Sequence, residues 1–252
     1  MVRQFLRKKA KIARGLWNTY FVKRGEIRDG RERWDELHYV HGVSDRQTLA
    51  ADKHLIAAKY HYNSVELKIL RHLREYGIET QGSVVLDIGS GAGHWIDFYK
   101  SLGSASTIGV DVSRLSTEYL RNKYKDHSDV TILHGKASEI LAGLDAKFNI
   151  VSAIGVMFHI VDDVEWIATI KMIARSLQPK GLLIVGGHFG CFDGLNVKFD
   201  PDGGVNKRLR SKSRWSRVLK EAEFSEIRVY RNQAYLWIDD VLPENHLLMA
   251  TR

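Results

Sequence analysis

Residues 84–93 read Val-Val-Leu-Asp-Ile-Gly-Ser-Gly-Ala-Gly, an apolar run that enters a glycine-rich turn. The β-branched and apolar residues that lead to Asp87 predict a buried parallel strand. Gly89, Gly91 and Gly93 let the following backbone turn tightly and approach a ligand without a clash from Cβ atoms. The stretch therefore predicts a strand, a loop and a helix that together cradle a cofactor.

The glycine spacing argues against a dinucleotide cofactor. The fingerprint of nicotinamide and flavin dinucleotide sites is Gly-x-Gly-x-x-Gly, in which the third glycine opens the helix. Here the third glycine comes one residue early, and His94 stands where that pattern needs glycine. The dinucleotide fingerprint is therefore not met.

A second acid follows about one strand-helix-strand unit later. Residues 106–113, Ser-Thr-Ile-Gly-Val-Asp-Val-Ser, predict another apolar strand that ends at Asp111, where a carboxylate could bridge two ribose hydroxyls. Asp-x-Gly-x-Gly-x-Gly followed by such an acid resembles the class I S-adenosylmethionine-dependent methyltransferases. The resemblance runs from about residue 80 to the C-terminus.

The resemblance implies S-adenosylmethionine as the cofactor and gives each motif residue a role. Asp87 would hold the methionine ammonium or a bound water, Gly89 and Gly91 would line the methionine and ribose, and Asp111 would take the ribose hydroxyls. S-adenosylmethionine is a sulfonium cation without phosphate, so its site needs close approach and carboxylates rather than a phosphate-binding helix N-terminus. The expected cofactor-binding residues are Asp87, Gly89, Ser90, Gly91, Gly93, Asp111, Val112, Lys136, Ala137 and Ile154.

The adenine end departs from the family pattern. After a third strand at residues 130–133, the family would have Gly-Asp-Ala, with the acid binding adenine, whereas this chain has Gly-Lys-Ala at residues 135–137. A lysine cannot accept the adenine amino proton. Either Ala137 donates to the ring alone, or Ser138 or Glu139 supplies the missing acceptor.

The rest of the chain continues the same alternation of strands and helices. Further strands are expected at residues 148–154, 182–185, 227–231 and 246–251, the last two antiparallel by the resemblance. The fold class expected is α/β: a Rossmann-like, doubly wound, mostly parallel seven-stranded sheet with an antiparallel C-terminal strand, plus an N-terminal helical extension. Residues 1–79 are interpreted as a basic helical extension or lid, and residues 80–252 as the methyltransferase domain.

Two histidines are candidates for catalysis. Methyl transfer from a sulfonium is an in-line displacement that depends on alignment and desolvation, and an acceptor hydroxyl can also require a base. His159 and His188 follow the fourth and fifth expected strands, and histidine titrates near neutral pH. His159 is the preferred base, and its alternative role is hydrogen-bonded packing. The spacing of the histidines predicts no metal site.

The positive charge of the 252-residue chain is concentrated at its start. Residues 1–34 hold eleven Lys or Arg against three acids, which accounts for the whole net charge of +8. An amphipathic basic helix over residues 1–24 is typical of a segment that docks on an anionic membrane surface. It could instead pack on the domain or on a second subunit of a homodimer, and RNA binding is a third alternative. The single Cys191, with no secretory signal or spanning segment, predicts a cytoplasmic or peripheral membrane protein.

A second basic cluster follows the fifth expected strand, at Lys207, Arg208, Arg210, Lys212, Arg214, Arg217 and Lys220. It could neutralise an anionic acceptor, although charges at a helix start are more often a solvated face. The favoured function is methyl transfer to an oxygen or nitrogen of a small-molecule, sugar or lipid-linked acceptor. The alternatives are RNA or protein methylation, with nucleic acid the less favoured partner, and a non-catalytic regulatory protein that binds S-adenosylmethionine.

Overall fold

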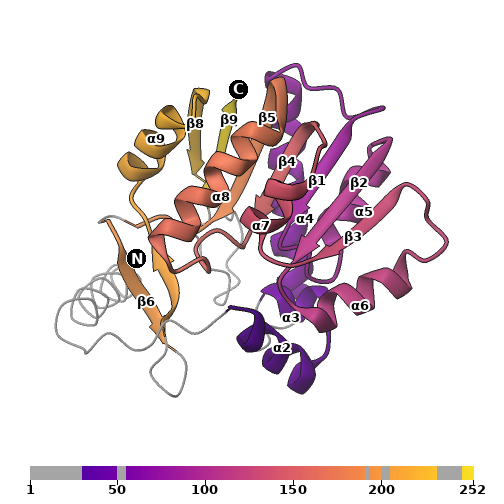
Figure 1. Cartoon of the computed structure of the whole chain (residues 1–252). Coiled ribbons are helices and arrows are strands. Elements are labelled where there is room, and N and C mark those ends of the chain that lie inside the picture. The colour runs from indigo at the N-terminus through magenta and orange to yellow at the C-terminus, as the bar shows by residue number, and fades with distance from the viewer. Residues whose placement is uncertain (1–29, 50–54, 191–192, 200–204, 232–245) are drawn as a thin grey trace.

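The computed structural model describes residues 30–49, 55–190, 193–199, 205–231 and 246–252 (Figure 1). The amphipathic helix expected over residues 1–24 lies outside these residues.

A seven-stranded sheet forms the centre of the molecule, in the order β3-β2-β1-β4-β5-β9-β8. Six strands run parallel, and β9 pairs antiparallel with both of its neighbours. This arrangement confirms the fold class expected from the sequence. The strands are β1 (Val84–Ile88), β2 (Ser106–Asp111), β3 (Val130–His134), β4 (Phe148–Ile154), β5 (Leu177–Gly187), β8 (Ser225–Arg231) and β9 (His246–Thr251).

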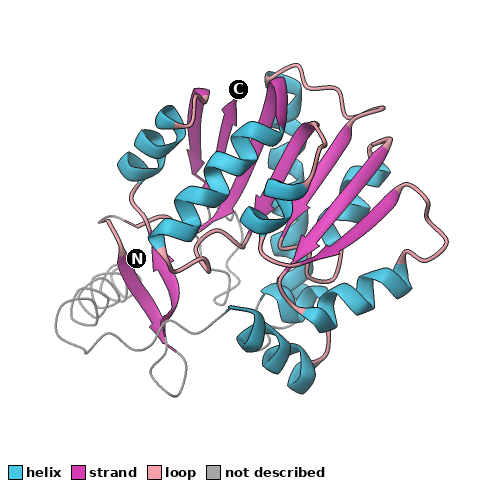
Figure 2. Cartoon of the chain, viewed as in Figure 1, coloured by secondary structure: helices cyan, strands magenta, loops and turns pink. Residues whose placement is uncertain are grey.

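Helices cover both faces of the sheet, which explains why the central strands are apolar on both sides (Figure 2). One core cluster lies between the sheet and the helices α7 (Ala137–Gly143), α8 (Asp163–Ser176) and α9 (Lys212–Glu221). On the other face, side chains of α5 (His94–Ser101) and α6 (Arg114–Lys123) pack against the strands. The carboxyl ends of the parallel strands are thereby left open for a site.

Among the described residues, three helices precede the first strand, in the region interpreted from the sequence as a helical extension or lid. They are α2 (Gly30–His41), α3 (Asp45–Leu49) and α4 (Leu55–Glu75). Helix α4 buries Val65, Ile69 and Leu73 against the same sheet face as α5. This helix therefore shares the core of the sheet domain.

A hairpin between β5 and α9 is absent from the sequence-based expectations, which placed a turn-rich loop and a helix start there. Its strands are β6 (Leu195–Phe199) and β7 (Val205–Leu209), which pair antiparallel. Helix α9 begins only after Ser211, whose hydroxyl accepts a hydrogen bond from the N–H of Arg214. Lys207 and Arg208 thus lie on a strand rather than on a helix.

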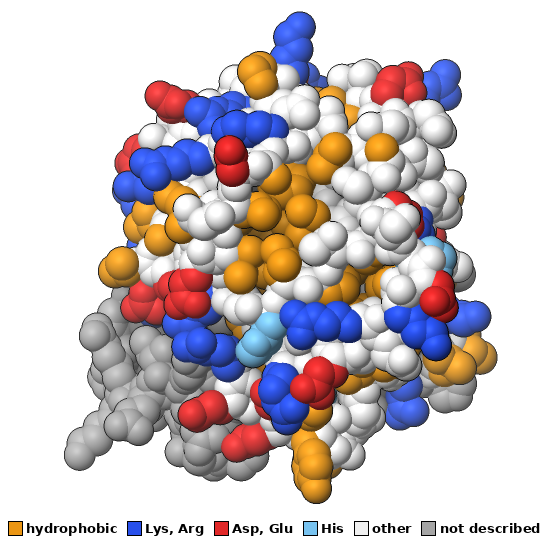
Figure 3. All heavy atoms as spheres, turned by 45° about the vertical axis from the view of Figure 1, so that its right-hand side comes forward, with side chains coloured by type: hydrophobic (Ala, Val, Ile, Leu, Met, Phe, Trp, Pro, Cys, Tyr) orange, Lys and Arg blue, Asp and Glu red, His pale blue; other side chains and the backbone are white. Residues whose placement is uncertain are grey.

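On the face that comes forward in Figure 3, apolar side chains gather in a central hollow bordered by charged side chains. Single exposed apolar residues are normal on protein surfaces, and only contiguous patches point to binding. A cavity with convergent polar groups lies at the carboxyl ends of the strands.

Candidate functional site

The glycine loop after β1 is shaped by close packing on both sides. Gly89 and Gly91 have positive φ angles of 73° and 53°. A Cβ on Gly89 would lie 2.7 Å from the Val156 Cβ, and one on Gly91 would lie 2.6 Å from the Thr48 Cγ2. The loop therefore requires glycine both for its conformation and for the approach of the β4 loop and helix α3.

The carboxylate of Asp111 joins the ends of β1 and β2. Its two oxygens accept hydrogen bonds from the N–H groups of Gly91, at 2.8 Å, and Ser113, at 2.9 Å. Burial raises the pKa of the Asp111 carboxyl, and these two N–H donors oppose the rise. Each carboxylate oxygen has more than one lone pair, so Asp111 can hold the loop and also accept from a ligand.

Asp87 lies behind the glycine loop rather than in the wall of the cavity. Its side chain is fully buried, and neither carboxylate oxygen has a hydrogen-bond partner within the described part of the chain. Burial raises the pKa of Asp87 to about 7, and the Ser90 hydroxyl donates to the backbone carbonyl of Asp87 rather than to its carboxylate. A buried carboxylate without a partner fits a site that receives a cationic group or an ordered water.

A cavity of about 510 Å³ opens at the carboxyl ends of β1, β2 and β4, a volume suited to a small-molecule ligand. The predicted residues that line it are Gly89, Ser90, Gly91, Asp111, Val112, Lys136, Ala137, Ile154 and His159. Asp87, Gly93 and His188 do not line it. Gly93 instead precedes α5 with a φ of 87°, where a Cβ would lie 2.6 Å from the hydroxyl of Tyr124.

The structure determines which nitrogen of His159 carries the proton. Its Nδ1 lies 2.8 Å from the backbone carbonyl oxygen of Asn206, on β7, and a carbonyl can only accept. Nδ1 therefore donates, and Nε2 keeps its lone pair in the neutral ring. Burial and the nearby ammonium of Lys207 hold the pKa of His159 well below its usual range. His159 is thus a neutral acceptor, packed edge-to-face against Trp34 at 5.0 Å between ring centroids.

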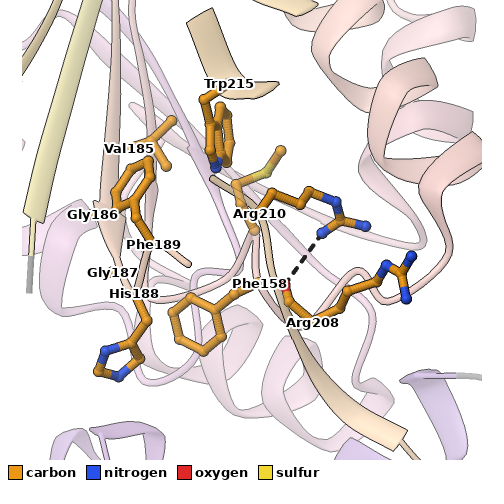
Figure 4. Close-up of a pocket in the computed structure, with 10 residues that line it drawn as sticks. Phe158, Val185, Gly186, Gly187, His188, Phe189, Arg208, Arg210 and Trp215 are labelled. Carbon is orange, nitrogen blue, oxygen red and sulfur yellow. Dashed lines mark hydrogen bonds between the residues drawn. The ribbon is translucent and has the colours of Figure 1, made fainter. Parts of the chain in front are cut away.

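His188 belongs to a second, much smaller cavity of about 10 Å³ between β5, the β4 loop and α9. In Figure 4 the rings of His188 and Phe158 lie beside each other at one end, and Trp215 lies at the other. The space is sufficient for about one water molecule. The structure therefore does not bring His188 to the cavity that contains Asp111 and His159.

Helix α2 adds residues to the site that the sequence reasoning missed. Gly30, Trp34 and His38 line the large cavity, at intervals of four residues that place them on one side of the helix. Asp35 accepts hydrogen bonds from the Ser113 hydroxyl, at 2.7 Å, and from the N–H of Leu115, at 3.2 Å. The four-residue spacing of the two rings, Trp34 and His38, was the only sequence signal for this wall.

His38 completes this connection and has a defined tautomer. The Ser113 hydroxyl donates to Asp35, so the Nδ1 of His38, 2.8 Å from that oxygen, is the donor to it. Burial lowers the pKa of His38, so the ring is neutral, and its Nε2 has no partner among the described residues. Helix α2 is thereby tied to the segment that follows Asp111.

Helices α3 and α4 are fastened to the other side of the glycine loop through His94. Its Nδ1 lies 3.2 Å from a carboxylate oxygen of Asp45, and its Nε2 lies 2.8 Å from one of Glu66. The imidazole also stacks on Tyr62 at 3.8 Å between ring centroids. Tyr62 and His61 both line the cavity, so helix α4 also forms part of its wall.

The second basic cluster is not simply a solvated helix face. Arg208, Arg210 and Arg214 each place a guanidinium nitrogen 2.9–3.1 Å from a carboxylate oxygen of Asp163, at the start of α8. Arg210 is 1% exposed and lies over the ring of Trp166 at 4.5 Å. The expectation of a wet face is wrong for these residues because it could not include an acid 45 residues away.

These arginines hold the loop that carries His159. Arg210 Nη2 donates to the carbonyl oxygens of Val161, at 3.5 Å, and Asp162, at 3.3 Å. The N–H of Arg208 donates to the carbonyl of Phe158 at 2.9 Å. Together with the hydrogen bond from His159 to Asn206, these contacts hold β7 beside the loop formed by residues 158–162.

Neither of the two side chains expected to replace the adenine acid reaches the cavity. Glu139 is exposed and does not line it, and the Ser138 hydroxyl donates to Glu165 Oε1 at 2.5 Å. Asp162 and Glu165, at the start of α8, do line the cavity. The expectation of Ser138 or Glu139 as the acceptor is therefore corrected, because α7 turns Glu139 away and Ser138 donates instead.

The described residues contain no group of three or more His, Cys, Asp or Glu side chains that could hold a metal ion. No helix among them is long and apolar enough to cross a membrane.

Known proteins share sequence and fold with the part of the chain that builds this site. A family model described as a methyltransferase domain matches residues 85–181. The demethylmenaquinone methyltransferase of Staphylococcus saprophyticus is 33% identical over 116 residues, which are 45% of this chain and 48% of that protein. The match thus spans about half the length of this curated relative.

Solved structures share the fold at low sequence identity. Magnesium protoporphyrin IX methyltransferase from Synechocystis PCC 6803, with bound S-adenosylmethionine, is 17% identical with a TM-score of 0.61, covering 90% of this chain and 99% of that one. The 1,6-didemethyltoxoflavin-N1-methyltransferase of Burkholderia thailandensis, with bound S-adenosylhomocysteine, is 14% identical with a TM-score of 0.63, covering 90% and 92%.

Proposed function

Because the chain carries a class I S-adenosylmethionine-dependent methyltransferase domain, whose cofactor is S-adenosylmethionine, we propose that it transfers the methyl group of this cofactor to an oxygen or nitrogen of a small-molecule acceptor. The observation that carries the proposal is that Asp111 and His159 line the same cavity, and that the Nε2 of His159 is the ring nitrogen not engaged by Asn206. One end can hold a ribose, and the other can hold a proton donor.

The residues of the cavity fit the cofactor. Gly89 and Gly91 line the cavity without side chains, so their backbone can approach a ligand closely. Asp111 would accept from the ribose hydroxyls, and the unpartnered carboxylate of Asp87 would balance the methionine ammonium, directly or through water. When bound, the cofactor supplies an electrophilic methyl group on a sulfonium.

His159 would position the acceptor and receive its proton. Because Nδ1 donates to Asn206, only Nε2 is available, and it can accept from a hydroxyl or an N–H group. The lowered pKa keeps the ring neutral, so the lone pair is present at neutral pH. The low pKa also makes His159 a weak base, which suits an acceptor whose proton leaves as the methyl group arrives.

The acceptor we propose is a small ring compound. The side chains of Trp34, Tyr62, His61 and His159 present aromatic rings to the cavity, and such rings favour stacked or edge-on planar ligands. The names of the relatives specify a quinone, a porphyrin and a toxoflavin, which are all ring systems. The cover formed by α2, α3 and α4 favours such a molecule over RNA or protein, whose chains would have to pass it.

The basic N-terminal segment supports a further proposal, that the enzyme is cytoplasmic, works at a membrane surface, and takes an acceptor that carries a lipid or a sugar. Residues 1–24 have the charge and apolar pattern of a segment that binds an anionic membrane surface. Homodimer formation through that segment is the competing proposal. Binding of the full chain to anionic vesicles, compared with a chain lacking residues 1–24, distinguishes the two.

The first experiment is calorimetric titration of the purified protein with S-adenosylmethionine and S-adenosylhomocysteine, with NAD as the control. Micromolar binding of the first two, and none of NAD, is expected. A screen of cyclic hydroxy and amino compounds for S-adenosylhomocysteine release then identifies the acceptor. Absence of binding by both adenosyl ligands would contradict the proposed function.

A further inference from the structure

The adenine end of the cavity can be located from the residues already described. In the cofactor the ribose lies between the methionine and the base, so a ribose at Asp111 with the methionine at the glycine loop directs the base away from that loop. The N–H of Gly135 donates to the carbonyl of Asp111 at 2.9 Å, which places the end of β3 beside it. The wall in that direction contains Lys136, Ala137 and Glu165.

At this end the chain has a cation, Lys136, at the position where the family that it resembles has an acid. Lys136 can donate but cannot accept, and the exocyclic amino group of adenine is a donor. Glu139 is exposed and absent from the cavity wall. An acceptor for the amino group must therefore come from another element.

Glu165, in the first turn of α8, is held at this position by two contacts. Its N–H donates to the carboxylate of Asp162 at 2.8 Å, which fixes the start of the helix. Its Oε1 accepts from the Ser138 hydroxyl at 2.5 Å, so the carboxylate lies directly beside the Ala137–Ser138 backbone. Within the described residues its Oε2 makes no hydrogen bond or ion pair, and Lys136 is not paired with it.

We propose that Glu165 accepts the hydrogen bond of the adenine amino group and so replaces the acid that the chain lacks at Lys136. This inference rests on the proposed function. A carboxylate is an acceptor only, so it pairs with a 6-amino purine and repels a 6-oxo purine. The selectivity of the site for adenine thereby resides on α8 rather than on the loop after β3.

The neighbouring acid is less suited to the same task. One carboxylate oxygen of Asp162 caps α8 through the N–H of Glu165, and its side chain is exposed. Glu165 is half-buried and anchored by Ser138, so its carboxylate is already oriented. The geometry favours Glu165 because less freedom is lost when the base binds.

The test is an exchange of donor and acceptor. Glu165→Gln has nearly the same shape, but its amide can donate to a 6-oxo group. Binding of S-adenosylhomocysteine and of its 6-oxo analogue, S-inosylhomocysteine, is measured calorimetrically for the wild type and the variant. The wild type should prefer the adenosyl ligand by about tenfold or more, and Glu165→Gln should reduce or invert that preference. Glu139→Gln, on the exposed face of α7, is the matched control and should keep the wild-type ratio.

Ser138→Ala provides a second variant, independent of any folding defect in the first. Loss of the anchoring hydroxyl should reduce the adenosyl preference about threefold while Glu165 is still present. A wild type that binds S-adenosylhomocysteine while both Glu165→Gln and Ser138→Ala keep its selectivity would overturn the inference alone. A wild type that binds neither ligand would overturn the proposed function, and this inference with it.

Discussion

Replacing Asp111 by alanine should weaken both the fold and cofactor binding, for separable reasons. The carboxylate accepts from the N–H groups of Gly91 and Ser113 at 2.8 and 2.9 Å, in a position where Asp111 is only 8% exposed. Each buried N–H left without a partner costs about 1 to 3 kcal/mol. Because water can enter the open side of the cavity, we expect a loss of about 2 to 4 kcal/mol in the free energy of unfolding.

The effect on binding is worked from the hydrogen bond that the ribose would lose. A charge-assisted hydrogen bond contributes about 1.5 to 3 kcal/mol, so the dissociation constant for S-adenosylhomocysteine should rise about 10- to 150-fold. Urea unfolding measures the first effect and calorimetry the second, under conditions in which the variant is still folded. Asp126→Ala removes an exposed aspartate and is the control. Unchanged cofactor affinity in folded Asp111→Ala would refute the assigned role.

Three further perturbations test the site. Asp87 has a pKa raised from 3.8 to about 7, so the folded protein retains a proton that the unfolded chain releases. Without ligand, the free energy of unfolding should therefore fall by a few kcal/mol as the pH rises from about 4 to 7. Urea titrations should show this pH dependence flattened in Asp87→Asn. His159→Ala should lower turnover about 100-fold with cofactor affinity unchanged, and equal activity would return His159 to a packing role. Because its pKa lies well below 6.5, wild-type activity should show no His159 titration between pH 6.5 and 8. Gly91→Ala should lower the free energy of unfolding by about 1 to 3 kcal/mol, since its Cβ would meet the Thr48 Cγ2. Adding Thr48→Ser removes that methyl group and should restore part of the loss, as measured by thermal unfolding. No rescue would mean that the positive φ alone causes the loss.

The sheet and the cofactor loop could be predicted because their signals are local. Apolar strands that end at Asp87 and Asp111 are continuous in the sequence, and the glycines between them require a particular backbone. The mostly parallel seven-stranded sheet was expected from the resemblance to the methyltransferases, and the structure confirms it and adds the strand order. His159 was placed by its position after β4, and the structure adds its tautomer through the carbonyl of Asn206.

The missed features all depend on partners distant in the chain. The hairpin of β6 and β7 looked like a charged helix start because Asp163, which gathers Arg208 and Arg210, lies 45 or more residues earlier. Glu165 was not considered for adenine because its link to Ser138 spans 27 residues. The sequence alone does not show which charged side chains will form a pair when they are far apart in the chain.

The hydrogen bond between His159 and β7 joins the part of the chain that the family model matches to a segment outside that part. The glycine loop and Asp111 lie within residues 85–181, the stretch matched by the family model, whereas α2 and the hairpin of β6 and β7 lie outside it. Those outer segments orient the imidazole and supply Trp34. A change in either segment can therefore alter which molecule is methylated while the glycine loop and Asp111, which would bind the methyl donor, stay the same.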